Sequence, residues 1–176
     1  MTVSSISLNI STPSEPIMSG RGFYQLEEEA LFVQIGLFTN NRRFYSYLEA
    51  AGLTLDFDRQ GRLIFVEVDI PRNQWVIQPE LVVPRVVEPA DIRWLNFRDT
   101  IRQPSFQTND RRDLLKLSFG QSAQLLSFYA ADSIVVQTDL FHTLMALWVS
   151  DIRDDLAGRK IRTFRKHSRA KQSYYS

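Results

Sequence analysis

The chain of 176 residues contains no cysteine, which excludes disulfide bonds, a thiolate nucleophile and any metal site built on cysteine. It has only two histidines, His142 and His167, and neither has a cysteine or the other histidine within ligand spacing. Its seven glycines are scattered and form neither a Gly-x-Gly-x-x-Gly nor a Walker A pattern. A nucleophile elbow is also missing, because Gly120-Gln121-Ser122 is typical of a turn. We therefore expect no catalytic residue, no metal and no cofactor.

Long apolar stretches are missing as well, since no run approaches the roughly 18 residues that a membrane-spanning helix needs. Residues 1–20 are rich in Ser, Thr and Pro and have neither the basic start nor the apolar stretch of a secretory signal. We expect a cytoplasmic protein that does not contact a membrane. Residues 1–20 are predicted to be a poorly ordered arm or a segment that pairs with a sheet edge.

Charge is unevenly distributed along the chain, although the net charge is only +1. The residues from Gly158 onward include seven cations and no acid, which leaves −6 on the rest of the chain. Such a block can bind nucleic acid or an acidic protein, or can fold back onto the acidic body. The candidate contact residues are Arg159, Lys160, Arg162, Arg165, Lys166, Arg169 and Lys171.

One β-meander occurs twice in the sequence, around residues 29–70 and 113–152. Residues 46–58 fall on 127–139 at a constant offset of 81, which also carries 63–68 onto 144–149, and an offset of 84 places 31–36 on 115–120. The matched positions alternate between apolar and polar, as half-buried strands require. We expect an α+β, predominantly β fold, with two antiparallel β-meander units in a pseudo-twofold tandem arrangement. The units are residues 21–71 and 106–152.

The clearest local element is the hairpin of residues 53–58 and 62–70. Its turn, Asp58-Arg59-Gln60-Gly61, has an Asp that can bond the turn backbone and a Gly that accepts left-handed geometry. The corresponding turn at residues 139–143 lacks the glycine, so we expect it to be longer or distorted. Residues 43–51 combine helical spacing with strand-forming aromatics, and we favour a strand over a helix.

A proline-punctuated joint, residues 72–105, connects the two units. It carries too many large apolar side chains to be a flexible linker, so it is expected to pack across both units. We predict an edge strand near 75–78 and a short helical turn after Pro89-Ala90-Asp91. Trp75 and Trp94 are expected in the core, with a protein interface as the alternative.

The C-terminal residues 153–176 are predicted to be helical and basic. Ser150 or Asp151 could cap a helix that runs to about Arg165, and the acids of its first turn and the later cations suit the helix dipole.

Residues 24–70 resemble the YuzE-like family of small bacterial proteins. The similarity rests on the acidic run Glu27-Glu28-Glu29 before a strand, the Asp58-x-x-Gly61 turn and the ending Val66-Glu67-Val68. It is fainter over 113–152, where Trp148 stands in the place of Glu67. The resemblance implies a small β-rich domain that can dimerise or partner a toxin-like neighbour, with no known activity or catalytic residue. If single-unit relatives pair, this chain would be a covalent pseudo-dimer with a degenerate second copy.

Carboxylates offer one alternative to a binding role. Asp56 and Asp58 share a strand face and, with Glu67, could hold a divalent cation or support acid–base chemistry. The simpler interpretation is a solvated face and a turn cap. We therefore predict a non-enzymatic binding or regulatory module for an unknown protein partner or a second copy. The main alternative is nucleic-acid binding through the basic C-terminal residues.

Overall fold

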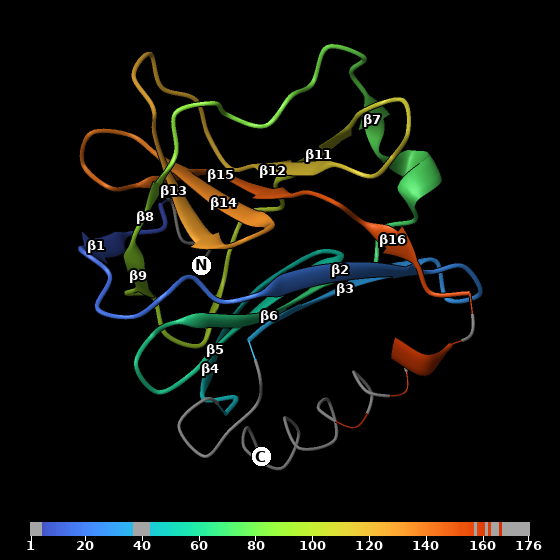
Figure 1. Ribbon diagram of the computed structural model, residues 1–176, viewed down its shortest axis with the longest axis horizontal. Coiled ribbons are helices and arrows are strands. Elements are labelled where there is room, and N and C mark those ends of the chain that lie inside the picture. The colour runs from blue at the N-terminus through green and yellow to red at the C-terminus, as the bar shows by residue number, and fades with distance from the viewer. Residues whose placement is uncertain (1–4, 37–42, 157, 161, 163–165, 167–176) are drawn as a thin grey trace.

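Two seven-stranded β-sheets pack face to face in the computed structural model, which describes residues 5–36, 43–156, 158–160, 162 and 166 (Figure 1). In order across the sheet, the first contains β10 (Asp99–Thr100), β4 (Ser46–Ala50), β5 (Leu53–Phe57), β6 (Leu63–Val68), β3 (Ala30–Ile35), β2 (Gly20–Gln25) and β16 (Arg153–Asp154). The second contains β7 (Val76–Ile77), β11 (Ser105–Thr108), β12 (Leu115–Ser118), β15 (Leu144–Val149), β14 (Ile134–Thr138), β13 (Leu126–Ala131) and β8 (Glu88–Pro89). The fold is thus mostly β, with sheets that are antiparallel at the centre and parallel at the edges.

Strand registers repeat between the two sheets. Leu31 pairs with Val68 as Leu115 pairs with Val149, so the offsets of 84 and 81 hold for these strands. The constant offset of 81 is wrong for most of β4, because the register of β13 shifts between Tyr129 and Ala131. Ala130 is an extra residue in a β-bulge, and the residues before it align at an offset of 80.

The outermost strands are exchanged between the halves of the chain. After the first meander, β7 adds in parallel to β11 of the second sheet, and after the second meander, β16 adds in parallel to β2 of the first sheet. The joint supplies both opposite edges, β8 beside β13 and β10 beside β4. All four edge strands have two residues, and such short edges leave little unpaired backbone for another chain to extend.

The two hairpin turns have the same backbone pattern, which contradicts the predicted distortion of the second. Asp58 Oδ1 accepts hydrogen bonds from the N–H groups of Gln60 and Arg62, and Asp139 Oδ1 does the same for Phe141 and Thr143. His142 occupies the left-handed position with φ 60°, where the first turn has Gly61 with φ 81°. The Asp side chain therefore specifies this turn even without glycine.

A single core lies between the sheets, formed by inward residues such as Leu31, Val66, Leu117 and Val149. Trp75 and Trp94 belong to it, as predicted for the core, with 2% and 4% of their surface exposed. No helix in the described part of the chain is long and apolar enough to cross a membrane.

The N-terminal segment pairs with the joint through residues 8–11, so the prediction of a poorly ordered arm is wrong there and the pairing alternative is right. Strand β1 (Leu8–Ser11) pairs with β9 (Asp91–Trp94) in a separate two-stranded sheet. Ile6 and Leu8 are buried in the core, which ties down this end of the chain.

Four further local predictions have an outcome. Residues 46–50 form a strand, and an edge strand lies at 76–77, as predicted. The helical turn after residue 89 is wrong, because residues 91–94 pair with β1, and the one helical turn of the joint is the 3₁₀ turn Arg72–Gln74. A helix from residue 150 is also wrong at its start, since Asp151 has φ 54° and residues 153–154 are a strand. The rest of the predicted helix lies mostly outside the described residues.

Candidate functional site

The predicted basic residues begin beside β2 of the first sheet. The N–H of Asp155 donates to the carbonyl of Tyr24 at 2.8 Å, and Asp155 Oδ1 accepts the N–H of Lys160 at 3.3 Å. The ammonium of Lys160 lies 5.2 Å from the ring centre of Phe23. Arg159, Lys160, Arg162 and Lys166 are exposed, and Arg165, Arg169 and Lys171 lie outside the described residues.

An open groove of about 510 Å³ adjoins this region, between the 3₁₀ turn Arg72–Gln74, the β11–β12 turn and β16. Arg72 binds Asp154 through both guanidinium nitrogens at 2.6 and 3.5 Å, and its guanidinium lies 4.5 Å from the ring centre of Tyr24. The side chains that line the groove are mostly charged: Arg72, Asp110, Arg111, Arg112, Asp113, Ile152, Arg153, Asp154 and Leu156.

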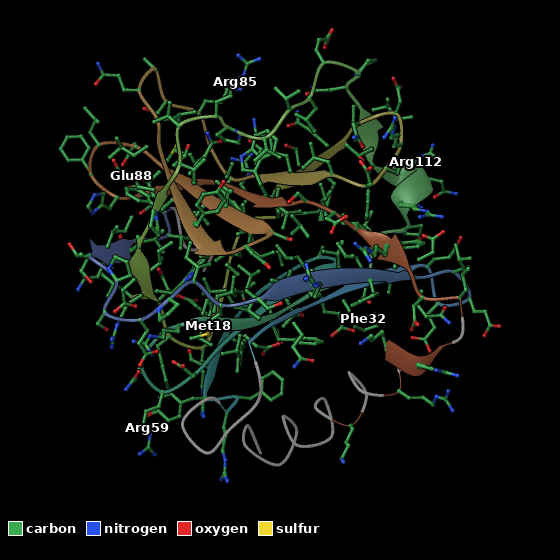
Figure 2. All side chains as sticks on the ribbon, in the orientation of Figure 1. Met18, Phe32, Arg59, Arg85, Glu88 and Arg112 are labelled. Carbon is green, nitrogen blue, oxygen red and sulfur yellow. The ribbon has the colours of Figure 1, made fainter. Side chains whose placement is uncertain are left out.

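Arg112 stands at the end of the molecule where β7 lies (Figure 2). Its backbone is left-handed, with φ 56°, and its buried Nε has no hydrogen-bond partner among the described residues. A guanidinium N–H without a partner is free to donate to an added oxygen. With Arg111 exposed nearby in the sequence, this groove has the chemistry to accept a phosphate or carboxylate.

A second surface combines aromatic rings and guanidinium groups near the edge of the first sheet where β10 pairs with β4. We call Tyr45, Arg59, Phe97 and Arg98 the aromatic–arginine surface. The rings of Tyr45 and Phe97 have centres 5.6 Å apart. Arg59 and Arg98 lie 5.3 and 6.0 Å from the centre of the Tyr45 ring, and Arg98 lies 5.2 Å from that of Phe97. Phe97 keeps 54% of its surface exposed, and Arg59 extends away from the sheets in Figure 2.

Hydrogen bonds fix Arg98 within this surface. Its N–H donates to Ser46 Oγ at 3.0 Å, and its Nε and Nη2 each donate to the carbonyl of Tyr45 at 3.3 Å. Its φ of 43° is uncommon for a residue other than glycine and is held by these contacts. The surface was missed in the sequence because Tyr45 and Phe97 are brought together only by the pairing of β10 with β4.

Asp91 forms a partly exposed ion cluster with two arginines, beside a cavity of about 70 Å³ between the N-terminal segment and β9. Its carboxylate accepts from Arg62 Nε at 3.3 Å and from Arg93 Nη2 at 3.1 Å. Burial raises the pKa of Asp91, but the hydrogen bonds and charges of Arg93 and Arg62 outweigh burial and hold the pKa below its usual range. The cluster ties β9 to the first hairpin.

The carboxylates of the first hairpin are not a solvated face. Asp56 and Asp58 are 0% and 1% exposed, and Asp58 caps the turn as predicted. Within the described ranges, no group of three or more His, Asp or Glu side chains could hold a metal ion. The ring of His142 packs edge-on against Phe128 at 6.2 Å.

No protein-family model matches the chain, and no curated protein matches it either.

Proposed function

We propose that the chain is a non-enzymatic protein-binding module whose main contact is the aromatic–arginine surface. The exposure of Phe97 and Tyr45 beside two guanidinium groups supports this proposal. Tyr and Arg are enriched at the few interface positions that supply most binding energy, and an exposed aromatic ring gains the most from burial. The surface of a partner that complements these two arginines is acidic and has apolar side chains between its carboxylates.

The fixed position of Arg98 supports the same role. Association costs free energy for each side chain that has to be ordered, and Arg98 is already held by Ser46 and by the Tyr45 carbonyl. The two-residue edge strands make binding by strand addition unfavourable, so recognition through side chains is the remaining route.

Affinity capture from the organism that encodes the chain tests this proposal. The bait proteins are the wild type, Phe97→Ala and the control Val86→Ala. Val86 precedes β8 as Phe97 precedes β10, and 84% of its surface is exposed, so both variants remove an exposed apolar side chain. We expect a stoichiometric partner with wild type and Val86→Ala, and a dissociation constant about 30-fold higher with Phe97→Ala, as for a hot spot of about 2 kcal/mol.

Two results would reject the proposal. One is a partner that all three baits retain equally, which would place binding elsewhere. The other is turnover of a metabolite by the isolated chain, which would make it an enzyme.

Nucleic-acid binding is the second candidate, and it is favoured by the groove that contains Arg111 and Arg112 and by the cations from residue 159 onward. Phosphate contacts make affinity fall linearly on a logarithmic salt scale. Binding of a random duplex would then weaken steeply with salt and disappear when residues 157–176 are removed. The absence of binding by the full chain at low salt would exclude this candidate.

We also propose that the two halves arose by tandem duplication of a YuzE-like unit and are related by a pseudo-twofold axis. The repeated registers and turns and the exchanged edges support this origin. A basic helical C-terminus and a cytoplasmic location remain part of the proposal.

A further inference from the structure

The outer face of the second sheet is covered by the joint. Residues 78–87 connect β7 at one edge to β8 at the other, and Figure 1 shows this segment crossing above the sheet. Seven strands about 4.8 Å apart span about 29 Å, which ten nearly extended residues can cover. Leu81, Val83 and Val87 pack there against Val135 and other buried residues of the outer face.

The outer face of the first sheet has a different chemistry at equivalent positions. Phe65 stands where the second sheet has Ala146, and with Phe32 and Phe44 it forms a buried aromatic cluster. Phe32 lies on the side of the sheet away from the second sheet (Figure 2). Asp56 and Glu67 stand where the second sheet has Gln137 and Trp148. This face therefore combines apolar and acidic character.

We infer that residues 157–176 of the same chain dock on this outer face. Strand β16 adds to the edge of the first sheet beside β2, just as β7 adds to the edge of the second sheet beside β11. The segment after β7 then crosses the outer face of the sheet that β7 has joined. By analogy, we expect the segment after β16 to cross the outer face of the first sheet. The described start of the C-terminal segment already follows this path, since Lys160 contacts the ring of Phe23, which pairs with Phe32 on the outer face.

Charge and length agree with this occupant. A mostly apolar segment covers the outer face of the second sheet, and the segment available to the first has seven cations and no acid from residue 158 onward. In the proposed docking, Ile161 and Phe164 supply the apolar side chains that meet the aromatic cluster. Twenty residues span about 30 Å as a helix, enough to cross the seven strands.

Paramagnetic relaxation enhancement tests the docking in the full chain. The protein has no cysteine, so Ser168→Cys gives one site for a nitroxide label. We expect broadened amide signals for β5 and β6, and unbroadened signals for the equivalent β14 and β15. Broadening should decrease at high salt, because screening weakens exposed ion pairs.

A variant separates specific docking from simple attachment near β2. Phe164→Ser should weaken the broadening over β5 and β6 by several-fold, and Tyr175→Ser is the control. Equal broadening of both sheets, or none on the first, would overturn the inference, as would an unchanged pattern in Phe164→Ser. Loss of partner capture by Phe97→Ala is independent of these outcomes, so this inference and the proposed function can fail separately.

Discussion

Replacing Gly61 by alanine tests how closely β9 packs against the first hairpin turn. Gly61 has φ 81°, and a Cβ at this position would lie 2.8 Å from the carbonyl oxygen of Trp94. A left-handed conformation costs a residue with a Cβ about 1–2 kcal/mol. The short contact adds to this cost, because relieving it moves β9 away from the turn.

That movement weakens the 2.7 Å hydrogen bond from the Trp94 N–H to the Gly61 carbonyl, and such a bond contributes about 0.5–1.5 kcal/mol. The lower entropy of alanine in the unfolded chain offsets about 0.4–1 kcal/mol. We therefore expect Gly61→Ala to lower the free energy of unfolding by about 2 kcal/mol. In a domain of this size, that corresponds to a decrease in Tm of about 4–8 °C.

His142→Ala is the matched control, because His142 occupies the same turn position and already has a Cβ in the left-handed conformation. Its carbonyl accepts the N–H of Leu8 at 3.0 Å, which the substitution leaves in place. We expect a change below about 1 kcal/mol from loss of the contact with Phe128. Urea unfolding followed by tryptophan fluorescence measures both variants. The reasoning is refuted if Gly61→Ala unfolds within about 0.5 kcal/mol of wild type, or if His142→Ala loses as much as Gly61→Ala.

Two other changes test the N-terminal pairing and the Asp91 cluster. Leu8→Ala should lower the free energy of unfolding by about 2–5 kcal/mol because Leu8 is buried. The control Asn9→Ala changes an exposed neighbour and should have little effect. Equal effects of the two variants in urea unfolding would mean that the N-terminal segment is not packed. The pKa of Asp91 is lowered in the folded state, so its ionisation stabilises the fold above the ordinary value of 3.8, and this contribution is lost as the pH falls through the folded pKa. The difference in unfolding free energy between wild type and Asp91→Asn should accordingly shrink below about pH 4, and a difference that stays constant in acid titration would contradict this assignment.

Strand alternation and turn chemistry were readable in the sequence because they depend on near neighbours. Leu31 and Val33 alternate with polar or outward residues at period two, and this pattern fixes which face meets the core. Asp58 and Asp139 bond backbone groups two and four residues ahead, so one residue type identifies both turns. The glycine was the less informative residue, since His142 adopts the same conformation.

The β-bulge at Ala130 could not be predicted from neighbouring residues in the sequence. An extra residue in β13 leaves the polar pattern of the turn unchanged, and only the register against β14 reveals it. The predicted start of the C-terminal helix was wrong for a related reason. The capping residues at 150–151 favour a helix locally, but pairing with β2 places residues 153–154 in a strand.

The sequence by itself determined the two meanders, their inward faces, the first hairpin and the concentration of positive charge at the C-terminus. Tertiary structure alone decided the exchange of edge strands, the pairing of β1 with β9 and the meeting of Tyr45 with Phe97. Near-neighbour preferences act over a few residues, whereas these contacts join residues 31 to 130 positions apart. Their free energy comes from burial and backbone pairing that exist only after both sheets have formed.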